Sequence, residues 1–315
     1  MITALKMRAA DPDSQPHRRS DQYRIAFVAG SGAMAGAITG GMVAALQANG
    51  IGARCFDLFV GTSAGAVAAA YYAADQAVEG ALIPSERLSS LGYNNDGSGT
   101  AYISILRALT GRGYLLDLDG FVDNVIDVDL ADVPVPVIAL ACTAQGELRQ
   151  LHLSGVSGAE MRQHLKSSMR VPYLSPGDLE DPDMLWDGAY LNVLPLDVAY
   201  THDATHVLAL ACFPPDVGPE LDFLERWLLA PIARLRGHAH IRKLVLGKME
   251  SNSRARASAE AVKRGRCFVH ELPGATLGQG TTDPAKLWLH MERAYHHTIE
   301  RFYLPHKDLP PRWQL

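Results

Sequence analysis

The sequence has little cysteine and no CxxC pair, the spacing that metal sites and redox motifs commonly use. Three of its four scattered cysteines stand in or beside apolar, strand-like runs; the four are Cys55, Cys142, Cys212 and Cys267. This usage is typical of buried free thiols in a reducing compartment. We therefore expect no metal site, and we expect a cytoplasmic protein.

An excess of positive charge is also missing. The formal net charge is −5 over 315 residues, which argues against general binding of nucleic acid. Apolar residues make up 48% and charged residues 20%, the balance of an ordinary globular protein. Because the chain shows no internal repeat and no linker-like segment, we expect one domain over residues 23–315 with a helical C-terminal third.

A long unbroken apolar segment is the third absence. Residues 25–53 carry no charge and exceed the ~20 residues that span a bilayer. They contain seven glycines, however, and are interrupted at Gly30-Ser31-Gly32. The segment divides better into a strand, a loop and a helix, so we expect no transmembrane span. The polar residues 1–22 before it lack a small-residue cleavage site, and we expect them to form a disordered tail.

What the chain does contain is an alternation of strand and helix. A strand at 23–29, a helix at 33–49 and a strand at 55–60 predict a right-handed parallel βαβ unit. Later strands and helices follow the same hydrophobic patterns; we expect strands at 135–142, 148–153, 206–212 and 267–272, and helices at 117–127, 158–169, from about Pro195, and at 283–303. The pattern predicts an α/β fold. The Gly-, Ser- and Asn-rich residues 84–113 are a candidate lid.

The second strand runs directly into Gly61-Thr62-Ser63-Ala64-Gly65, and an alanine-rich helix follows. A serine with a glycine two residues away on each side, between strand and helix, is the pattern of a nucleophile elbow. Bulky residues at Gly61 or Gly65 would collide with the strand or the helix. The turn would present the Ser63 hydroxyl at the positive end of the following helix.

Two further motifs have chemistry that fits this serine. Gly30-Ser31-Gly32 follows the first strand, where backbone N–H groups without helical partners could stabilise an oxyanion. Asp187-Gly188-Ala189 follows a short apolar strand, and its carboxylate can be presented at the same sheet edge as Ser63. Other Asp-Gly pairs occur at Asp96 and Asp119, but only Asp187 has a strand before it and Asn192 and Pro195 after it.

Together these motifs resemble the bacterial patatin-like phospholipases. The resemblance covers about residues 23–213 and includes local similarity at 115–120, 137–143 and 165–172. It implies a three-layer α/β/α fold with a mostly parallel central sheet. It also implies a Ser–Asp dyad of Ser63 as nucleophile and Asp187 as base, with no cofactor. The oxyanion would be bound by the loop from Gly30 to Gly32 and by the Ala64 N–H, and Gly61, Gly65 and Gly188 would shape the turns. The implied activity is hydrolysis of lipid or other acyl esters through an acyl-serine.

One departure from the family concerns the oxyanion loop. The family usually has an arginine or lysine there, followed by glycine, whereas this chain has Met34 and Ala35. Backbone donors survive the change, and one such donor is worth roughly 10²–10³ in rate. We therefore expect weakened or altered activity. An acyltransferase with the same dyad and a non-catalytic descendant that binds lipid or a partner both remain alternatives.

Two other enzyme classes share parts of the pattern. Gly30-x-Gly32-x-x-Ala35 matches a dinucleotide-binding fingerprint, but that site needs an acid at the far end of the second strand, and Asp57 stands at its start. A Ser–His–Asp triad would need one of the histidines after Asp187; the candidates are His202, His206 and His270. In α/β-hydrolases several strands precede the elbow, whereas here a single strand precedes the elbow strand.

A local charge bias marks residues 234–266, which carry ten Lys or Arg against two Glu. Such a segment forms either a solvated helical face or a patch that contacts the anionic headgroups of a membrane as a peripheral protein.

Overall fold

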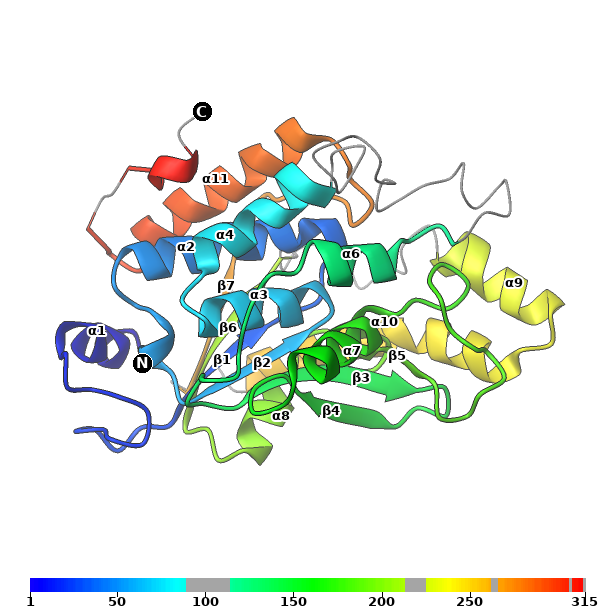
Figure 1. Cartoon of the computed structure of the whole chain (residues 1–315), viewed down its shortest axis with the longest axis horizontal. Helices are drawn as coiled ribbons and strands as arrows, with labels where there is room; N and C mark the ends of the chain where they lie inside the picture. Colours follow the sequence, from blue (N-terminus) through cyan, green and yellow to red (C-terminus); the bar gives the residue numbers. More distant parts are fainter. Residues whose placement is uncertain (89–113, 213–224, 262–265, 306–307, 314–315) are drawn as a thin grey trace.

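A computed structural model describes residues 1–88, 114–212, 225–261, 266–305 and 308–313 (Figure 1). Its centre is a seven-stranded sheet in the order β4-β3-β2-β1-β6-β7, with β5 paired to β3. The strands are β1 Ile25–Ala29, β2 Leu58–Thr62, β3 Val137–Thr143, β4 Leu148–His152, β5 Leu185–Asp187, β6 His206–Ala211 and β7 Cys267–Glu271. Strands β3, β2, β1, β6 and β7 are mutually parallel, while β4 and β5 run antiparallel to β3. The mostly parallel sheet is therefore confirmed.

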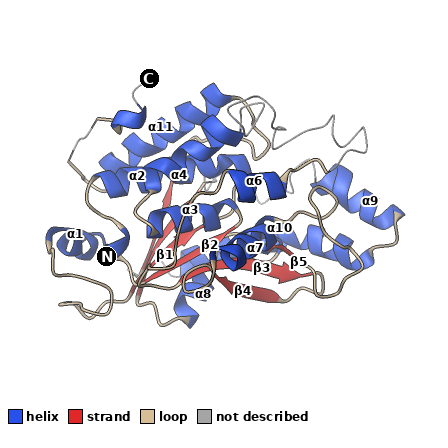
Figure 2. Ribbon diagram, in the orientation of Figure 1, coloured by secondary structure: helices blue, strands red, loops and turns tan. Residues whose placement is uncertain are grey.

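Helices cover both faces of this sheet (Figure 2). They are α1 Ile2–Ala10, α2 Gly36–Ala48, α3 Ala64–Ala73, α4 Ala77–Leu82, α6 Leu118–Asn124, α7 Gly158–Met169, α8 Leu196–Thr201, α9 Ala230–Leu235, α10 Ala239–Ala261 and α11 Pro284–Arg301. Shorter helical segments are η1 Ala33–Ala35, η2 Ala53–Cys55, η3 Ile83–Leu88, η4 Gly188–Tyr190, η5 Glu225–Leu229 and η6 Pro311–Trp313.

The alternation of side chains along β1 explains the layers. Ile25 and Phe27 point to one face and belong to the core formed with α2, α3, α4, α7 and α11. Ala26 and Val28 point to the other face and pack with the apolar side of α8. Because both faces of a parallel sheet are covered, its strands are apolar throughout. The predicted three-layer α/β/α architecture and the parallel β1–α2–β2 unit are both confirmed.

The structure differs from the expected disorder of residues 1–22. Residues Ile2–Ala10 form α1, and Leu5 is fully buried against the core. The polarity of this segment suggested a free tail because no local sequence pattern pairs its charged side chains: Arg8 pairs with Asp21, 13 residues away, and with Asp57.

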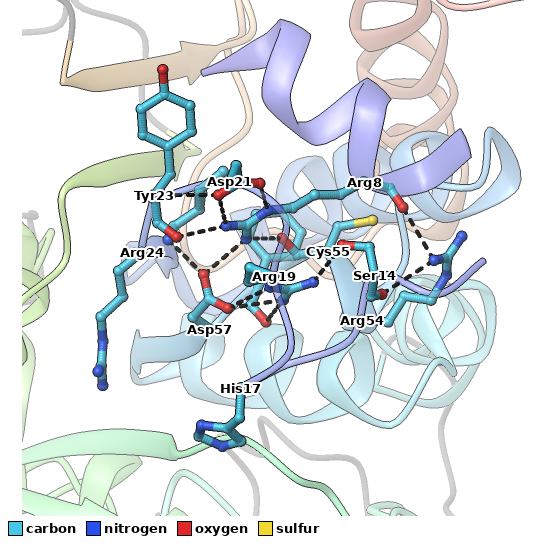
Figure 3. A network of polar contacts seen from close by, with 12 residues as sticks. Arg8, Ser14, His17, Arg19, Asp21, Tyr23, Arg24, Arg54, Cys55 and Asp57 are labelled. Atoms are coloured by element: carbon cyan, nitrogen blue, oxygen red, sulfur yellow. Dashed lines mark hydrogen bonds and ion pairs between the residues drawn. The ribbon is translucent and has the colours of Figure 1, made fainter. Parts of the chain in front are cut away.

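A network of polar contacts around Arg8 holds this segment in place (Figure 3). Arg8 is only 2% exposed and forms ion pairs of 2.8 Å with both Asp21 and Asp57. Arg19 binds the other oxygen of Asp57 at 2.9 Å. Asp57 stands just before β2 and also accepts a hydrogen bond from the Ile25 N–H. The N-terminal segment is thus connected to the starts of β1 and β2.

Three further expectations concern particular segments. The candidate lid at 84–113 lies mostly outside the described residues; only 84–88 are described, as part of η3. All four cysteines are free, and all but Cys267 are buried, as expected. Within the described ranges, no helix combines the length and apolar character needed to cross a bilayer.

Candidate active site

Ser63 stands at the turn between β2 and α3, at the carboxyl end of the central strands. Its backbone has φ 57° and ψ −125°, a region that residues other than glycine rarely adopt and that costs of order 1–3 kcal/mol. Its N–H donates to the Ser168 Oγ on α7 at 3.1 Å. Ser63 lies at the N-terminus of α3, where the helix dipole favours negative charge.

The glycines of the elbow are required by close backbone contacts. A Cβ on Gly61 would collide with the backbone of Gly65 and Ala66 in the first turn of α3. A Cβ on Gly65 would collide with the carbonyl oxygens of Ala29 and Gly30 at the end of β1. Only glycine therefore lets α3 start so close to both strands, as expected from the sequence.

The register of β3 places Asp187 next to the elbow. Strand β2 follows one edge of β3 as far as the pairing of Thr62 with Leu140. Strand β4 occupies the opposite edge of β3, so β5 must pair on the edge that β2 leaves when the chain turns into α3. Asp187 pairs with Ala141, the residue after Leu140. The last residue of β5 therefore meets the chain where Ser63 turns away from the sheet.

Several hydrogen bonds fix the position of Asp187, which is 7% exposed like Ser63. One carboxylate oxygen accepts from the Ala189 N–H at 2.8 Å, and the Asp187 N–H donates to the Arg170 carbonyl at 2.8 Å. The Cys142 thiol donates to the Asp187 carbonyl oxygen at 3.2 Å. Burial, together with the charge of Asp187, raises the pKa of Cys142 well above its usual range, so the thiol keeps its proton.

Gly188 makes the turn after Asp187 possible. A Cβ there would lie 2.6 Å from the Leu140 carbonyl oxygen of β3. The turn continues into η4, where Tyr190 is buried beside the site.

The glycine loop after β1 offers different donors from those expected. The Gly30 and Ser31 N–H groups already donate to the carbonyls of Leu210 and Val193, at 3.0 and 2.9 Å. Among the hydrogen bonds of the described residues, none uses the N–H of Gly32 or of Ala33. Ala33 has a positive φ of 47°, and such turns can aim successive N–H groups at one anion. Gly32 was expected from the glycine pattern, whereas Ala33 was not, because no sequence signal marks its positive φ.

Ser63 and Asp187 line one cavity of about 360 Å³. Most of its wall is apolar and comes from α2, α3, η3 and the residues around α6 and α7, including Val43, Val67, Ile83, Leu116, Phe121, Met169 and Leu174. Ser31, Ala33 and Ala64 also line it, so the N–H groups of Ala33 and Ala64 belong to residues of the same cavity as Ser63 and Asp187. An apolar cavity with few polar groups suits an acyl chain.

Lys248 is the one cation among the described residues that line this cavity. It comes from α10, and its Nζ lies 5.8 Å from the centroid of the Tyr190 ring. Met34 lines the cavity from the oxyanion loop. In the sequence Lys248 stands out only as part of the basic segment 234–266, because no local pattern connects α10 with Ser63.

The three candidate histidines lie away from the cavity. His202 contacts the Gln150 Oε1 at 2.7 Å, and His206 opens β6, whereas Ser63 follows the end of β2. His270 is buried against Thr298 of α11 at 2.8 Å, and burial is the main cause that lowers its pKa to about 3. None of them is among the described residues that line the cavity, so the structure does not assemble the alternative triad.

Comparison with known proteins decides the family. The family model described as patatin-like phospholipase matches residues 27–200, more than half of the chain. The chain belongs to this family. It is 26% identical over 226 residues to the neuropathy target esterase sws of Drosophila melanogaster; the match covers 66% of this chain and 14% of that protein. The crystal structure of VipD from Legionella pneumophila matches with a TM-score of 0.46 and 12% identity, over 90% of this chain and 67% of that one.

The patatin-like match contains the loop after β1, the elbow and Asp187, but it ends before α9 and α10. Lys248 therefore reaches the cavity from a part of the chain that the family model does not cover. Within the described residues, no cluster of His, Cys, Asp and Glu is arranged to hold a metal ion.

Proposed function

We propose that this protein hydrolyses acyl esters of lipids, with Ser63 as nucleophile and Asp187 as base. The proposal rests on one observation about strand pairing. β5 pairs with β3 just beyond the point where β2 stops, and this pairing supports a position of Asp187 beside the elbow. Membership of the patatin-like phospholipase family and the apolar cavity support a lipid substrate.

In the proposed first step, Asp187 takes the proton of the Ser63 hydroxyl as Oγ attacks the ester carbonyl carbon. The negative charge that develops on the carbonyl oxygen would be stabilised by the N–H groups of Gly32, Ala33 and Ala64 and by the N-terminus of α3. Breaking the C–O bond then releases the alcohol, which takes the proton from Asp187, and leaves an acyl-Ser63.

In the second step, Asp187 takes a proton from water while the water oxygen attacks the acyl carbonyl. The Ser63 Oγ leaves with that proton, and the carboxylic acid is released. A carboxylate in water is a weak base; Asp187 is 7% exposed at a mostly apolar cavity, and burial in general disfavours the charged form of a carboxyl group. An alcohol in place of the water would give acyl transfer with the same residues.

We assign to Lys248 the binding of an anionic group next to the scissile ester, such as the phosphate of a phospholipid. It provides a positive charge in the cavity, whereas the loop itself provides Met34. A charge-assisted bond in an apolar environment is stronger than the same bond in water.

Covalent labelling tests the dyad. A fluorophosphonate probe should modify Ser63, and Ser63→Ala should abolish both labelling and hydrolysis of a short-chain nitrophenyl ester. Asp187→Asn should lower kcat/KM by about 10²-fold or more, as expected for loss of a general base. Asp119→Asn is the matched control, since Asp119 also precedes a glycine but is exposed and pairs with Lys166; it should keep full activity.

Unchanged turnover in Ser63→Ala would overturn the proposal. Absence of labelling in the folded wild-type protein would favour the non-catalytic alternative. Mass spectrometry of the products, with and without an added alcohol, distinguishes hydrolysis from acyl transfer.

A further inference from the structure

Helix α9 and the segment η5 before it expose large apolar side chains. Trp227 is 63% exposed, Leu228 41% and Leu235 87%. Pro231, also exposed, stands four residues from both Trp227 and Leu235, so the three follow successive helical turns. We call Trp227, Leu228, Pro231 and Leu235 the α9 ridge. Exposed apolar side chains gathered in this way usually mark an interaction site.

Positively charged side chains lie around the α9 ridge. Arg234 and Arg236 are exposed at its C-terminal end, and Arg242 and Lys243 are exposed in the first part of α10. The sequence contains no aspartate or glutamate between Trp227 and Lys248. Glu225 precedes this stretch, and Glu180 contacts His238 within it at 2.8 Å. The surface is therefore both apolar and positively charged.

The opposite side of α9 packs behind the cavity wall. Leu229, Ala230 and Ala233 are buried in one apolar cluster with Leu174 and Tyr190, which line the cavity of Ser63. In Figure 1, α9 stands at the outer end of the molecule, away from α2 and α11. A surface bound to the α9 ridge would therefore lie on the other side of α9 from the cavity wall where an acyl chain is proposed to bind.

We propose that the α9 ridge docks onto a bilayer that contains anionic lipids. Tryptophan and leucine side chains enter the interface of a bilayer, while arginine and lysine contact its headgroups. The absence of acids between Trp227 and Lys248 fits a surface of uniformly negative charge better than a protein partner of mixed charge. Docking would place the cavity beside the lipids and concentrate them there. The proposal goes beyond hydrolysis, because docking does not need turnover.

Vesicle co-sedimentation tests the proposal, in the Ser63→Ala background so that no lipid is consumed. We expect binding to vesicles of phosphatidylcholine with phosphatidylglycerol, weak binding to phosphatidylcholine alone, and loss of binding as salt is raised. Leu235→Glu and Arg236→Glu should each lower the partition coefficient at least ~10-fold, since each replaces a favourable contact with a repelled carboxylate. Both residues are exposed, so folding should be preserved.

Leu289→Glu and Lys286→Glu are the matched controls, because both residues are exposed on α11, on another part of the molecule, and should leave binding unchanged. Leu235→Glu with active Ser63 should hydrolyse a water-soluble ester at the wild-type rate, which separates docking from catalysis.

Equal binding by wild type and Leu235→Glu would overturn the proposal. So would a dimer, seen by analytical ultracentrifugation, that Leu235→Glu dissociates while vesicles bind neither protein. Binding without any esterase activity would refute the proposed function and leave the docking surface intact.

Discussion

Ser63 needs a residue from another element to keep its strained conformation. The Ser168 hydroxyl of α7 accepts the Ser63 N–H at 3.1 Å, and Ser168 is fully buried. The positive φ of Ser63 is unfavourable on its own, so the surrounding bonds must hold it. We therefore infer that Ser168 is a positioning residue, which acts through the backbone of the proposed nucleophile Ser63.

We predict that Ser168→Ala lowers kcat about 10-fold or more with little change in KM. The Ser63 N–H would lose its partner, and an unsatisfied buried donor costs about 1–3 kcal/mol. Ser167→Ala is the control, because the Ser167 hydroxyl takes part in none of the hydrogen bonds found among the described residues. The labelling rate of Ser63 by a fluorophosphonate gives a second measurement. Equal kcat values for the two variants, both folded, would contradict this role.

The position of Lys248 in the cavity leads to a separate prediction about substrate charge. Lys248→Met should lower kcat/KM for a monomeric short-chain phospholipid by about 10–100-fold, the value of a charge-assisted hydrogen bond of about 1.5–3 kcal/mol. Hydrolysis of a neutral nitrophenyl ester should change little, and Lys248→Arg should retain most activity on both substrates. Lys243→Met, on the exposed side of the same helix, is the control. An equal loss on both substrates would mean that Lys248 stabilises the transition state instead.

At the scale of elements, β5 is the piece that completes the site. Its three residues, Leu185–Asp187, are too few to show a strand period, and their pairing partner β3 lies more than 40 residues away in the sequence. The sequence located Asp187 through the glycine after it and the apolar residues before it. It could not show that β5 continues the edge of β3 where β2 stops.

The element α1 gives a prediction about stability. Arg8→Met should lower the free energy of unfolding by about 3 kcal/mol or more, because it removes the buried cation that pairs with Asp21 and leaves Asp57 paired with Arg19 alone. Urea denaturation at neutral pH measures this change. Arg18→Met is the control, since Arg18 is exposed, and it should change the stability by less than ~0.5 kcal/mol. If both variants unfolded at the same urea concentration, the network would contribute nothing.

The same network predicts a response to acid. The hydrogen bond from Arg8 is the main cause that lowers the pKa of Asp21 below its ordinary value. A carboxylate with a lowered pKa in the folded state contributes stability above its unfolded pKa and loses it as the pH falls.

At the scale of the whole molecule, His270 connects the edge strand β7 to α11 through its hydrogen bond with Thr298. Burial first, and then the charges of His297 and Arg301, lower its pKa to about 3. An unfolded histidine has a pKa of about 6.5, so between these values the unfolded chain binds a proton that the folded protein does not. This contribution leaves stability unaffected above pH 6.5 and lowers it as the pH falls from there toward 3.

We therefore predict that His270→Phe flattens the pH dependence of stability below pH 6.5. As the pH falls below 6.5, this residue should lower the free energy of unfolding of the wild-type protein by about 1.4 kcal/mol per pH unit. The variant should lack this contribution. Phenylalanine suits the position because His270 already contacts the rings of Phe268 and Phe302. His202→Phe, at a half-buried position, should keep the wild-type slope. Urea denaturation at several pH values tests this, and identical slopes in all three proteins would contradict it.

The elements and their α/β alternation were largely predictable because hydrophobic patterns are local, whereas the order of the strands in the sheet was not predicted beyond the β1–α2–β2 unit. Helix 158–169 was predicted with the bounds that α7 has, and the strand at 206–212 differs from β6 by one residue. The second strand was placed too early, since residues 53–55 form η2 before β2 begins at Leu58. The error at residues 1–22 has a different cause: Arg8 and Arg19 find their carboxylate at Asp57, which no local pattern connects with them.

The sequence by itself determined the elbow, because Gly61, Ser63 and Gly65 must share one short turn and their spacing specifies its geometry. It also determined the alternation of strand and helix, which follows from side-chain period. The tertiary structure decided which groups meet at that turn: Ser168 behind Ser63, Asp187 at the edge left by β2, and Lys248 across the cavity. These residues come from separate elements, and only the packing of those elements brings their side chains together.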